Sequence, residues 1–355
     1  MEPVTHFLTG ACLGRSGFNR RTAYATLAMT LAAEAPDMDI FWGLRGPVAG
    51  FQHHRGITHT FLGAPFVALA VTGVVWFWHR SRRRPPVVPP RWGWVWLLSC
   101  LAVLSHIFLD WTNNYGVRPF FPFNPRWYSL DIAFIVEPVI FAALLLGLVI
   151  PAIFGLADRE IGAGKPLFRG RGWAIGALVL VGIDLGVRAV EHHRALHLIG
   201  NTRFGDQPML RAAAQPYPVN PFHWFALVET TGYYQTGSVN TWSETVDTSD
   251  HDDVIFKPPV TPAVMAAKRS WLGRVYLDWA RFPLVEDRGH ANLVASDELA
   301  PEPLDTAVEF SDLRFAYPPL SRGKTGATTR ALSAWDYIAP NGAIDAMVMN
   351  GRVQK

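Results

Sequence analysis

Histidine and carboxylate side chains recur at the ends of apolar segments in the first 140 residues. They fall into four groups: His6, the stretch APDMD with Asp37 and Asp39, the stretch HHRGITHT at residues 53–60, and the stretch SHIFLDW with His106 and Asp110. Imidazoles supply neutral nitrogen ligands and carboxylates supply charge-compensating oxygen, a combination that suits Zn²⁺, Mn²⁺ or Fe²⁺. A metal ion held this way can activate water for hydrolysis. These residue types therefore predict a metal centre, provided that the fold brings the four groups together.

The pair in SHIFLDW carries most weight. His106 and Asp110 are four residues apart, so they share one face of a helix. A carboxylate within such an apolar run is costly without a partner. The other groups each have an ordinary alternative when taken alone, since His6 suits a helix cap and Asp37-x-Asp39 suits a solvated turn. Taken jointly, the groups favour a metal site over coincidence.

The elements that must position these residues are mostly membrane helices. Charged residues make up only 17% of the 355 residues and hydrophobic ones 50%, whereas soluble proteins average about 25% charged. A helix needs about 20 apolar residues to cross a bilayer. Four windows meet this need: Phe61–Trp78, Trp92–Leu109, Ile132–Ala157 and Gly172–Val190. The last contains Asp184 and Arg188, which we expect to form a structural ion pair along one helix face. We predict four transmembrane helices rather than the buried helices of a large soluble protein.

Before these windows, residues 6–18 and 22–35 form two shorter apolar segments, and Pro36 should end the second. They predict an antiparallel helical pair, re-entrant or buried against the other helices. The start of the chain has no basic leader and no cleavage site typical of a secretory signal, so we expect it to be mature sequence. The two cysteines lie in apolar stretches and predict neither a disulfide nor a cysteine-based zinc site.

The loops predict the orientation. Residues 79–91 hold five arginines and no acid, and residues 158–171 are also basic. The positive-inside rule places both loops in the cytoplasm. Every candidate ligand then lies at the outer end of its element. Residues after about 195 would be outside, where strand-like alternation and one amphipathic helix predict a small domain. We thus predict a mainly α, polytopic helical membrane domain at residues 1–195, followed by a mainly β extracytoplasmic domain at residues 196–355.

The groups suggest specific roles. We expect His6, His59, His106 and Asp110 to bind metal, with Asp37 as a further ligand or a bridge. Asp39 or Glu137 would be the general base that activates a metal-bound water. Arg55 is either an anion clamp or a contact to lipid headgroups. One to three divalent ions are expected, zinc being favoured over manganese or iron.

The order of these motifs also resembles a known family. THFLTG, APDMD, HHRGITHT, SHIFLDWTNNYG and RWYSLDIAFIVEP are similar to stretches of the YdjM-like, LexA-regulated inner-membrane metal-dependent hydrolases. The resemblance is strong over residues 1–150 and weaker beyond. It implies a multi-pass protein of the bacterial inner (plasma) membrane with a hydrolytic metal centre. The matching positions are His6, Asp37, Asp39, His54, His59, His106 and Asp110. Because His53 stands beside His54, the sequence leaves open which imidazole is the ligand and which supports it.

These observations favour a metal-dependent hydrolase at the outer membrane face, acting on a phosphoester or lipid-linked substrate. A fainter similarity to zinc-dependent phospholipase C and related nucleases agrees with a phosphoester. Membrane lipid is an expected partner and nucleic acid is not. The alternative is a metal- or proton-coupled transporter, although such sites usually lie near the midplane between repeated halves. A mere membrane anchor for a binding domain would leave the intramembrane carboxylates without a purpose.

Overall fold

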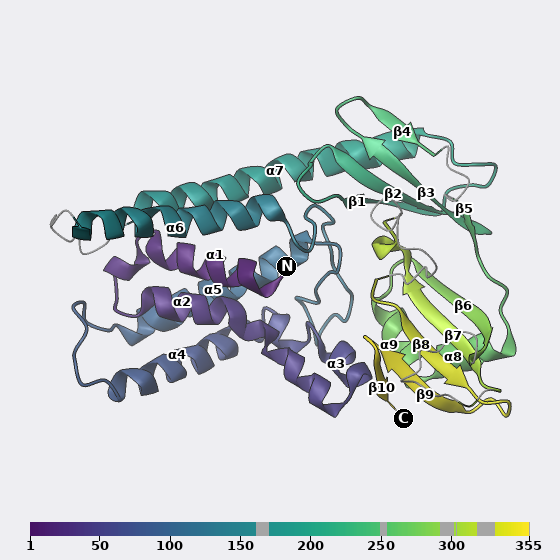
Figure 1. The fold of residues 1–355 in the computed structure, drawn as a ribbon, viewed down its shortest axis with the longest axis horizontal. Helices are drawn as coiled ribbons and strands as arrows, with labels where there is room; N and C mark the ends of the chain where they lie inside the picture. The colour runs from purple at the N-terminus through teal and green to yellow at the C-terminus, as the bar shows by residue number, and fades with distance from the viewer. Residues whose placement is uncertain (161–169, 249–253, 292–301, 303, 318–330, 355) are drawn as a thin grey trace. The chain divides into compact units, whose positions relative to one another are not determined.

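The computed structural model describes residues 1–160, 170–248, 254–291, 302, 304–317 and 331–354. The chain divides into two compact units. The first comprises residues 1–39, 55–194 and 216–224, and it is helical. The second comprises residues 40–54, 195–215 and 225–355, and it is mainly β (Figure 1). A helical membrane part followed by a small, mainly β C-terminal domain is thus confirmed.

The first unit contains six α-helices among the described residues: α1 (Pro3–Arg15), α2 (Ala25–Glu34), α4 (Ala64–Arg80), α5 (Trp92–Thr112), α6 (Pro138–Glu160) and α7 (Arg171–Asn201, whose last seven residues belong to the second unit). Among them, α5, α6 and α7 are long and apolar enough to cross a membrane. The apolar window predicted at residues 61–78 corresponds to α4, which has only 17 residues. It supplies a fourth crossing if residues 47–59 and α4 together form one bent span. Short 3-10 helices complete the unit: η1 (Phe18–Arg20), η2 (Ala35–Arg45, whose last six residues belong to the second unit) and η3 (Ile57–His59).

The predicted antiparallel pair at the start of the chain is confirmed as α1 and α2. The two helices approach closely at Gly10 and Gly14, where an added Cβ would lie 2.5 Å from the carbonyl oxygen of Met29 and 2.4 Å from the Cα of Thr26, respectively. Glycines four residues apart permit such backbone contact between membrane helices. The second helix ends at Glu34, two residues before Pro36, where the sequence predicted its end. The close packing fixes His6 on α1 against the end of α2.

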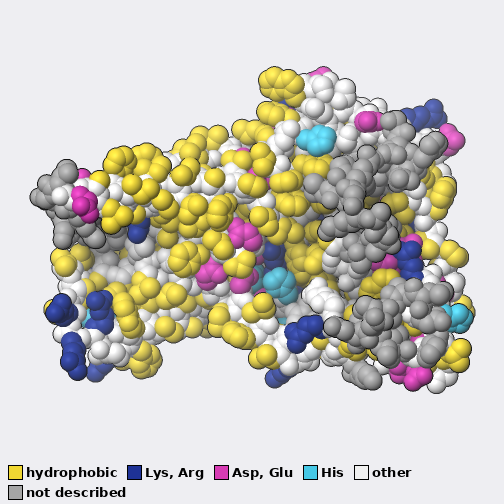
Figure 2. All heavy atoms as spheres, viewed as in Figure 1, with side chains coloured by type: hydrophobic (Ala, Val, Ile, Leu, Met, Phe, Trp, Pro, Cys, Tyr) yellow, Lys and Arg dark blue, Asp and Glu magenta, His cyan; other side chains and the backbone are white. Residues whose placement is uncertain are grey.

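Helices α6 and α7 lie side by side (Figure 1) and pack on α1 through a cluster of buried apolar side chains that includes Leu8, Ile140, Leu144 and Ala177. Hydrophobic side chains also cover much of the visible face of these helices, and lysine and arginine side chains gather at one end of the helical unit (Figure 2). Large apolar side chains on α6 and α7, such as Ile153 and Leu180, are exposed, which would be unfavourable in water. This surface is that of a helix bundle in lipid.

The second unit contains two sheets. In the first, β1 (Arg211–Pro216), β2 (His223–Glu229), β3 (Tyr233–Asn240) and β4 (Thr245–Asp247) follow one another, and β5 (Val254–Phe256) pairs with β3. The second has the order β10-β9-β8-β7-β6. Its strands, which pair antiparallel, are β6 (Pro283–His290), β7 (Thr306–Asp312), β8 (Ala334–Ile338), β9 (Ile344–Met349) and β10 (Arg352–Gln354). The turn Thr-Thr-Gly at residues 230–232 joins β2 to β3.

The one long helix predicted in this unit is two helices, α8 (Pro262–Arg269) and α9 (Trp271–Trp279). Ser270 separates them because its hydroxyl oxygen accepts a hydrogen bond from the backbone N–H of Gly273 at 2.7 Å, which caps α9. The short helix α3 (Pro47–His53) also belongs to this unit, where the ring of Phe51 packs against Tyr276 and Trp279. The basic loop at residues 158–171, used to predict orientation, lies largely outside the described residues.

Candidate metal centre

Four of the predicted ligands converge in the first unit. The side chains of Asp37, His59, His106 and Asp110 each bring one donor atom into a group whose members all lie within 4.8 Å of one another. They come from η2, η3 and the last turns of α5. His106 and Asp110 lie on one face of α5, with Nε2 and Oδ2 3.4 Å apart, as the four-residue spacing predicted. The two histidines and Asp110 are fully buried.

The spacing of the donor atoms matches a tetrahedral metal site. Nε2 of His59 lies 3.0 Å from Nε2 of His106. Each imidazole nitrogen also lies 3.4–3.6 Å from a carboxylate oxygen of Asp37 and of Asp110. Zinc binds nitrogen and oxygen ligands at about 2.0–2.1 Å, so the ligands of a tetrahedral zinc stand about 3.3–3.4 Å apart. The separations that involve an imidazole nitrogen are therefore close to those expected around one metal ion of this size.

Both imidazoles are held with Nε2 toward the centre. Nδ1 of His106 lies 2.6 Å from the carbonyl oxygen of Ala33, to which it donates. Nδ1 of His59 lies 3.3 Å from Oδ2 of Asp39 and 3.1 Å from the hydroxyl of Thr58. Hydrogen bonds of this kind fix the tautomer, orient the ring and raise the basicity of the ligating nitrogen. The structure thus places Asp39 behind His59 rather than among the donor atoms.

The carboxylates at the end of α2 are positioned by an unusual stretch of backbone. Residues 35–45 form a 3-10 helix of 11 residues, although such runs rarely exceed three or four. Asp39 is 5% exposed, whereas the side chain of Asp37 is 23% exposed, so Asp37 is the ligand nearest to solvent. Burial alone would raise the pKa of Asp37, but hydrogen bonding to His59 and the nearby His106 lower it to about 2. Asp37 is therefore an anionic candidate ligand at neutral pH.

His6 adjoins the centre on its α1 side. Its ring stacks on that of His106 with centroids 3.7 Å apart, and its Nε2 lies 3.4 Å from Oδ1 of Asp110. Both ring nitrogens of His6 and Oδ2 of Asp110 are buried and have no hydrogen-bond partner among the described residues. Buried polar atoms are normally satisfied, so unpaired nitrogen and oxygen at this point agree with a metal-binding role. His6 lies within reach of the centre but outside the group of four donors.

Arg55 lies beneath Asp110. Its Nη2 donates to Oδ1 of Asp110 at 2.8 Å, and its Nη1 donates to the carbonyl oxygen of Gly116 at 2.8 Å. The guanidinium stacks on Tyr115, and the residue is only 5% exposed. The amino group of Met1 also contacts Asp110. Arg55 thus orients Asp110, a candidate ligand, and is covered by protein. Its expected role as an anion clamp or a headgroup contact stays a prediction. The segment 113–116, NNYG, belongs to the site for this reason, although only the family resemblance drew attention to it.

The remaining predicted residues lie elsewhere. Glu137 is buried in an ion pair with Arg188 at 3.0 Å and accepts the backbone N–H of Val219 at 2.9 Å. The predicted Asp184–Arg188 pair is also present, at 3.1 Å. His54 follows α3 in the second unit and is not in the group of four donors. His53 stacks on Trp42 with ring centroids 4.0 Å apart. No described contact joins Glu137 to the metal ligands.

Sequence reasoning assigned no role to Glu34. Burial, with the charge of Asp37 adding to it, raises the pKa of Glu34 to about 7. Its Oε1 is buried and has no hydrogen-bond partner among the described residues. A carboxyl with a pKa near neutrality beside a metal ligand is suited to general base chemistry. Its signal in the sequence is its position in EAPDMD, three residues before Asp37.

These features define an integral membrane protein with a histidine- and aspartate-rich cluster that can bind a metal ion. The chain belongs to the family of the YdjM inner membrane protein, whose model matches residues 1–195. The family predicted from the motifs is thus confirmed. The match covers all four converging donors and His6.

Comparison with curated proteins finds a similar chain in the uncharacterized protein YfhP of Bacillus subtilis (strain 168), which is 28% identical over 158 residues. That alignment covers 42% of this chain and 46% of YfhP, so the chain spans less than half the length of this relative. No solved structure matches.

Proposed function

We propose that this protein is a membrane-bound, metal-dependent hydrolase acting on a phosphoester or lipid-linked substrate at the outer face of the inner membrane. The observation that carries the proposal is the group of four donors, three of them buried, whose imidazole nitrogens lie 3.0 Å from each other and 3.4–3.6 Å from the carboxylate oxygens, with both imidazoles oriented by hydrogen bonds. When bound, a divalent ion here would supply Lewis acidity and lower the pKa of a coordinated water to about 7. Zinc is the favoured ion because the ligands are imidazoles and carboxylates at this spacing.

The exposure of the ligands suggests where substrate approaches. Asp37 is the most exposed of the four, so the open side of the centre is the side on which Asp37 and Glu34 lie. In this proposal Asp37, His59, His106 and Asp110 would hold the ion, and Glu34 would accept the proton of the attacking water. Asp39 keeps His59 in place, and Arg55 keeps Asp110 in place. Asp39 or Glu137 as general base is a less favoured assignment, because each already has a buried partner.

Aromatic side chains support a location at headgroup depth. Phe61 and Trp111 each follow a candidate ligand within two residues. They form a cluster with Phe120 and Tyr128, in which Phe61 and Phe120 are 5.4 Å apart and Trp111 and Tyr128 are 5.8 Å apart. Phe61 and Phe120 are 43% and 41% exposed. Trp and Tyr are enriched at membrane interfaces because their rings are amphipathic. A centre at this depth suits a lipid-linked substrate, and the arginines of loop 79–91 favour the outer face.

Two measurements test the proposal. Elemental analysis of the purified protein should find a bound divalent metal, which His59→Ala and Asp110→Asn should lose while keeping their helical circular dichroism. The metal-loaded protein should hydrolyse bis(p-nitrophenyl) phosphate or a fluorescent phospholipid in mixed micelles. Glu34→Gln should bind metal normally yet hydrolyse the substrate at least tenfold more slowly, since general bases contribute about 10²–10⁴-fold. The proposal fails if the protein binds no metal.

Metal binding without hydrolysis would favour the transporter. Four protein ligands leave no vacant position in a tetrahedral site, whereas catalytic zinc sites usually have three protein ligands and a water. Uptake of metal into vesicles containing the protein, lost in His59→Ala, would then replace the hydrolase proposal.

A further inference from the structure

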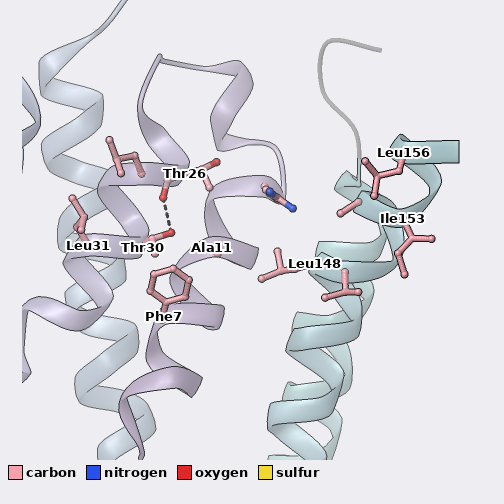
Figure 3. Close-up of a pocket in the computed structure, with 12 residues that line it drawn as sticks. Phe7, Ala11, Thr26, Thr30, Leu31, Leu148, Ile153 and Leu156 are labelled. Carbon is pink, nitrogen blue, oxygen red and sulfur yellow. Dashed lines mark hydrogen bonds between the residues drawn. The ribbon is translucent and has the colours of Figure 1, made fainter. Parts of the chain in front are cut away.

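An apolar groove lies on the surface of the first unit, away from the metal centre. It has a volume of about 580 Å³ and is lined by residues of α1, α2 and α6. Phe7, Ala11, Thr30 and Leu31 face it from one side, and α6 faces it from the other with Leu148, Ile153 and Leu156 (Figure 3). Nearly all of this lining is carbon. The hydroxyl of Thr30 donates to the carbonyl oxygen of Thr26 at 2.8 Å and so offers no donor to a ligand.

The groove has one charged lining residue, Arg15, at the end of α1. Phe7, Ala11 and Arg15 are spaced by four residues, so they form one stripe along this helix. The side chain of Arg15 is half-buried, and the described residues provide it with no ion pair. From Arg15 to Phe7 the helix rises about 12 Å. The hydrocarbon core of a bilayer is about 30 Å thick, so this distance is close to the depth of one leaflet.

Arg15 lies at the basic end of the helical unit. The carbonyl oxygen of Ser16, its neighbour, accepts a hydrogen bond from Nε of Arg171 at 3.1 Å. Nearby, the backbone N–H of Arg91 donates to the hydroxyl of Thr22 at 2.8 Å. The end of α1 and the starts of α2, α5 and α7 therefore meet at one level. Positively charged side chains at such a level lie near the phosphates of the bilayer.

We propose that this groove binds one acyl chain of an anionic phospholipid, whose phosphate is held by Arg15. The chain lies along the stripe of α1 toward Phe7, with Ile153 and Leu156 of α6 covering its other side. A guanidinium with no ion pair among the described residues, above an apolar groove one leaflet deep, is complementary to both parts of such a lipid. A structural lipid here would join α6 to the α1–α2 pair, which carries His6 and leads into η2. The site is independent of the hydrolase proposal because no metal ligand lines the groove.

The test uses native mass spectrometry of the full-length protein, purified in detergent and titrated with phosphatidylglycerol or phosphatidylcholine. Wild type should retain one phosphatidylglycerol in preference to phosphatidylcholine. Arg15→Gln should lower this retention about fivefold, because one basic side chain contributes about 1 kcal/mol to the binding of anionic lipid. Arg15→Lys should restore part of it. Arg84→Gln is the matched control, since it removes the same charge from the exposed loop 79–91.

A second pair of variants tests the apolar part. Ala152→Phe places a ring inside the groove and should lower retention of the lipid, whereas Ala157→Phe, on an exposed part of α6 that does not line it, should not. Equal retention in wild type, Arg15→Gln and Ala152→Phe would overturn the proposal. Equal retention of phosphatidylglycerol and phosphatidylcholine by wild type would overturn the proposal that Arg15 selects an anionic lipid. A dimer in nanodiscs that Ala152→Phe abolishes would instead assign the groove to a second copy of the chain.

Discussion

Replacing Asp39 by alanine separates two readings of this residue. The sequence left it as a candidate general base, whereas the structure places its Oδ2 3.3 Å from Nδ1 of His59 and 2.7 Å from the backbone N–H of Arg55. A group that orients a ligand affects metal affinity, but a general base affects turnover. We therefore expect Asp39→Ala to bind the divalent ion more weakly. The helical fold should be retained, since no ligand is removed.

The size of the effect follows from the role. Loss of an outer partner of a metal-bound histidine typically costs 10–100-fold in affinity, which is about 1.4–2.8 kcal/mol. Asp39→Asn should lie toward the lower end, because its amide oxygen can still accept from His59 and from Arg55. Asp37→Ala removes a donor atom and should weaken binding further. The metal dissociation constant of each variant can be measured by competition with a chromogenic chelator, with circular dichroism as the check on folding.

Two results would refute this account of Asp39. If Asp39→Ala binds metal as tightly as wild type but turns over substrate slowly, the residue is a base and the orienting role is wrong. If Asp39→Ala and Asp37→Ala lose metal equally, Asp39 is itself a ligand and the tetrahedral group is wrongly composed. Thr58→Val is a useful comparison, because the Thr58 hydroxyl also lies 3.1 Å from Nδ1 of His59. It should have a smaller effect, since the hydroxyl carries no charge.

Two further predictions concern stability. Burial raises the pKa of Asp336 in β8 to about 7, against a smaller opposing contribution from Ser270. Because this folded-state pKa is above the unfolded-state pKa of about 3.9, the free energy of unfolding is highest below pH 4 and falls as the pH rises to 7. The expected difference is about 4 kcal/mol. Chemical denaturation of the β domain should show this fall between pH 4 and 8 in wild type and not in Asp336→Asn, and parallel curves would refute it. Gly10→Leu places a Cβ 2.5 Å from the carbonyl oxygen of Met29, so it should lower the free energy of unfolding by about 1–3 kcal/mol. Thermal unfolding in detergent should show the loss. Gly93→Leu should unfold like wild type, because an added Cβ at Gly93 has no neighbouring atom within 4 Å.

The parts of the site that sequence could predict are those set by local geometry. His106 and Asp110 share a helix face because of their spacing, and Asp184 pairs with Arg188 for the same reason. The second partner of Arg188 is Glu137, 51 positions away in the sequence, and no periodic pattern indicates that contact. As a result Glu137 resembled a free carboxylate at a helix start. Its burial with a cation explains why an acid stands there without any need for catalysis.

The sequence predicted Asp37 as a candidate ligand but did not predict the backbone that positions it. A proline after an apolar helix predicts its end, and α2 does end there, but nothing in APDMD predicts 11 residues of 3-10 helix. In a 3-10 helix, side chains three residues apart point the same way, whereas side chains two residues apart point in different directions. Asp37 and Asp39 therefore face opposite sides of His59, toward Nε2 and Nδ1 respectively. In a solvated turn, either carboxylate could have taken either role. The backbone conformation makes Asp37 the candidate ligand and Asp39 the residue that orients His59.

The position of Arg55 bears on the number of metal ions. Oδ2 of Asp110 belongs to the donor group, and a second ion would need Oδ1, which His6 approaches at 3.4 Å. That oxygen already accepts from Arg55 at 2.8 Å. A divalent ion about 4 Å from a guanidinium would be repelled by about 8 kcal/mol at an effective dielectric constant of about 20. We infer that one ion is favoured, with Arg55 as the second positive charge on Asp110. Of the one to three ions that the sequence allowed, the lower end is then the expected stoichiometry.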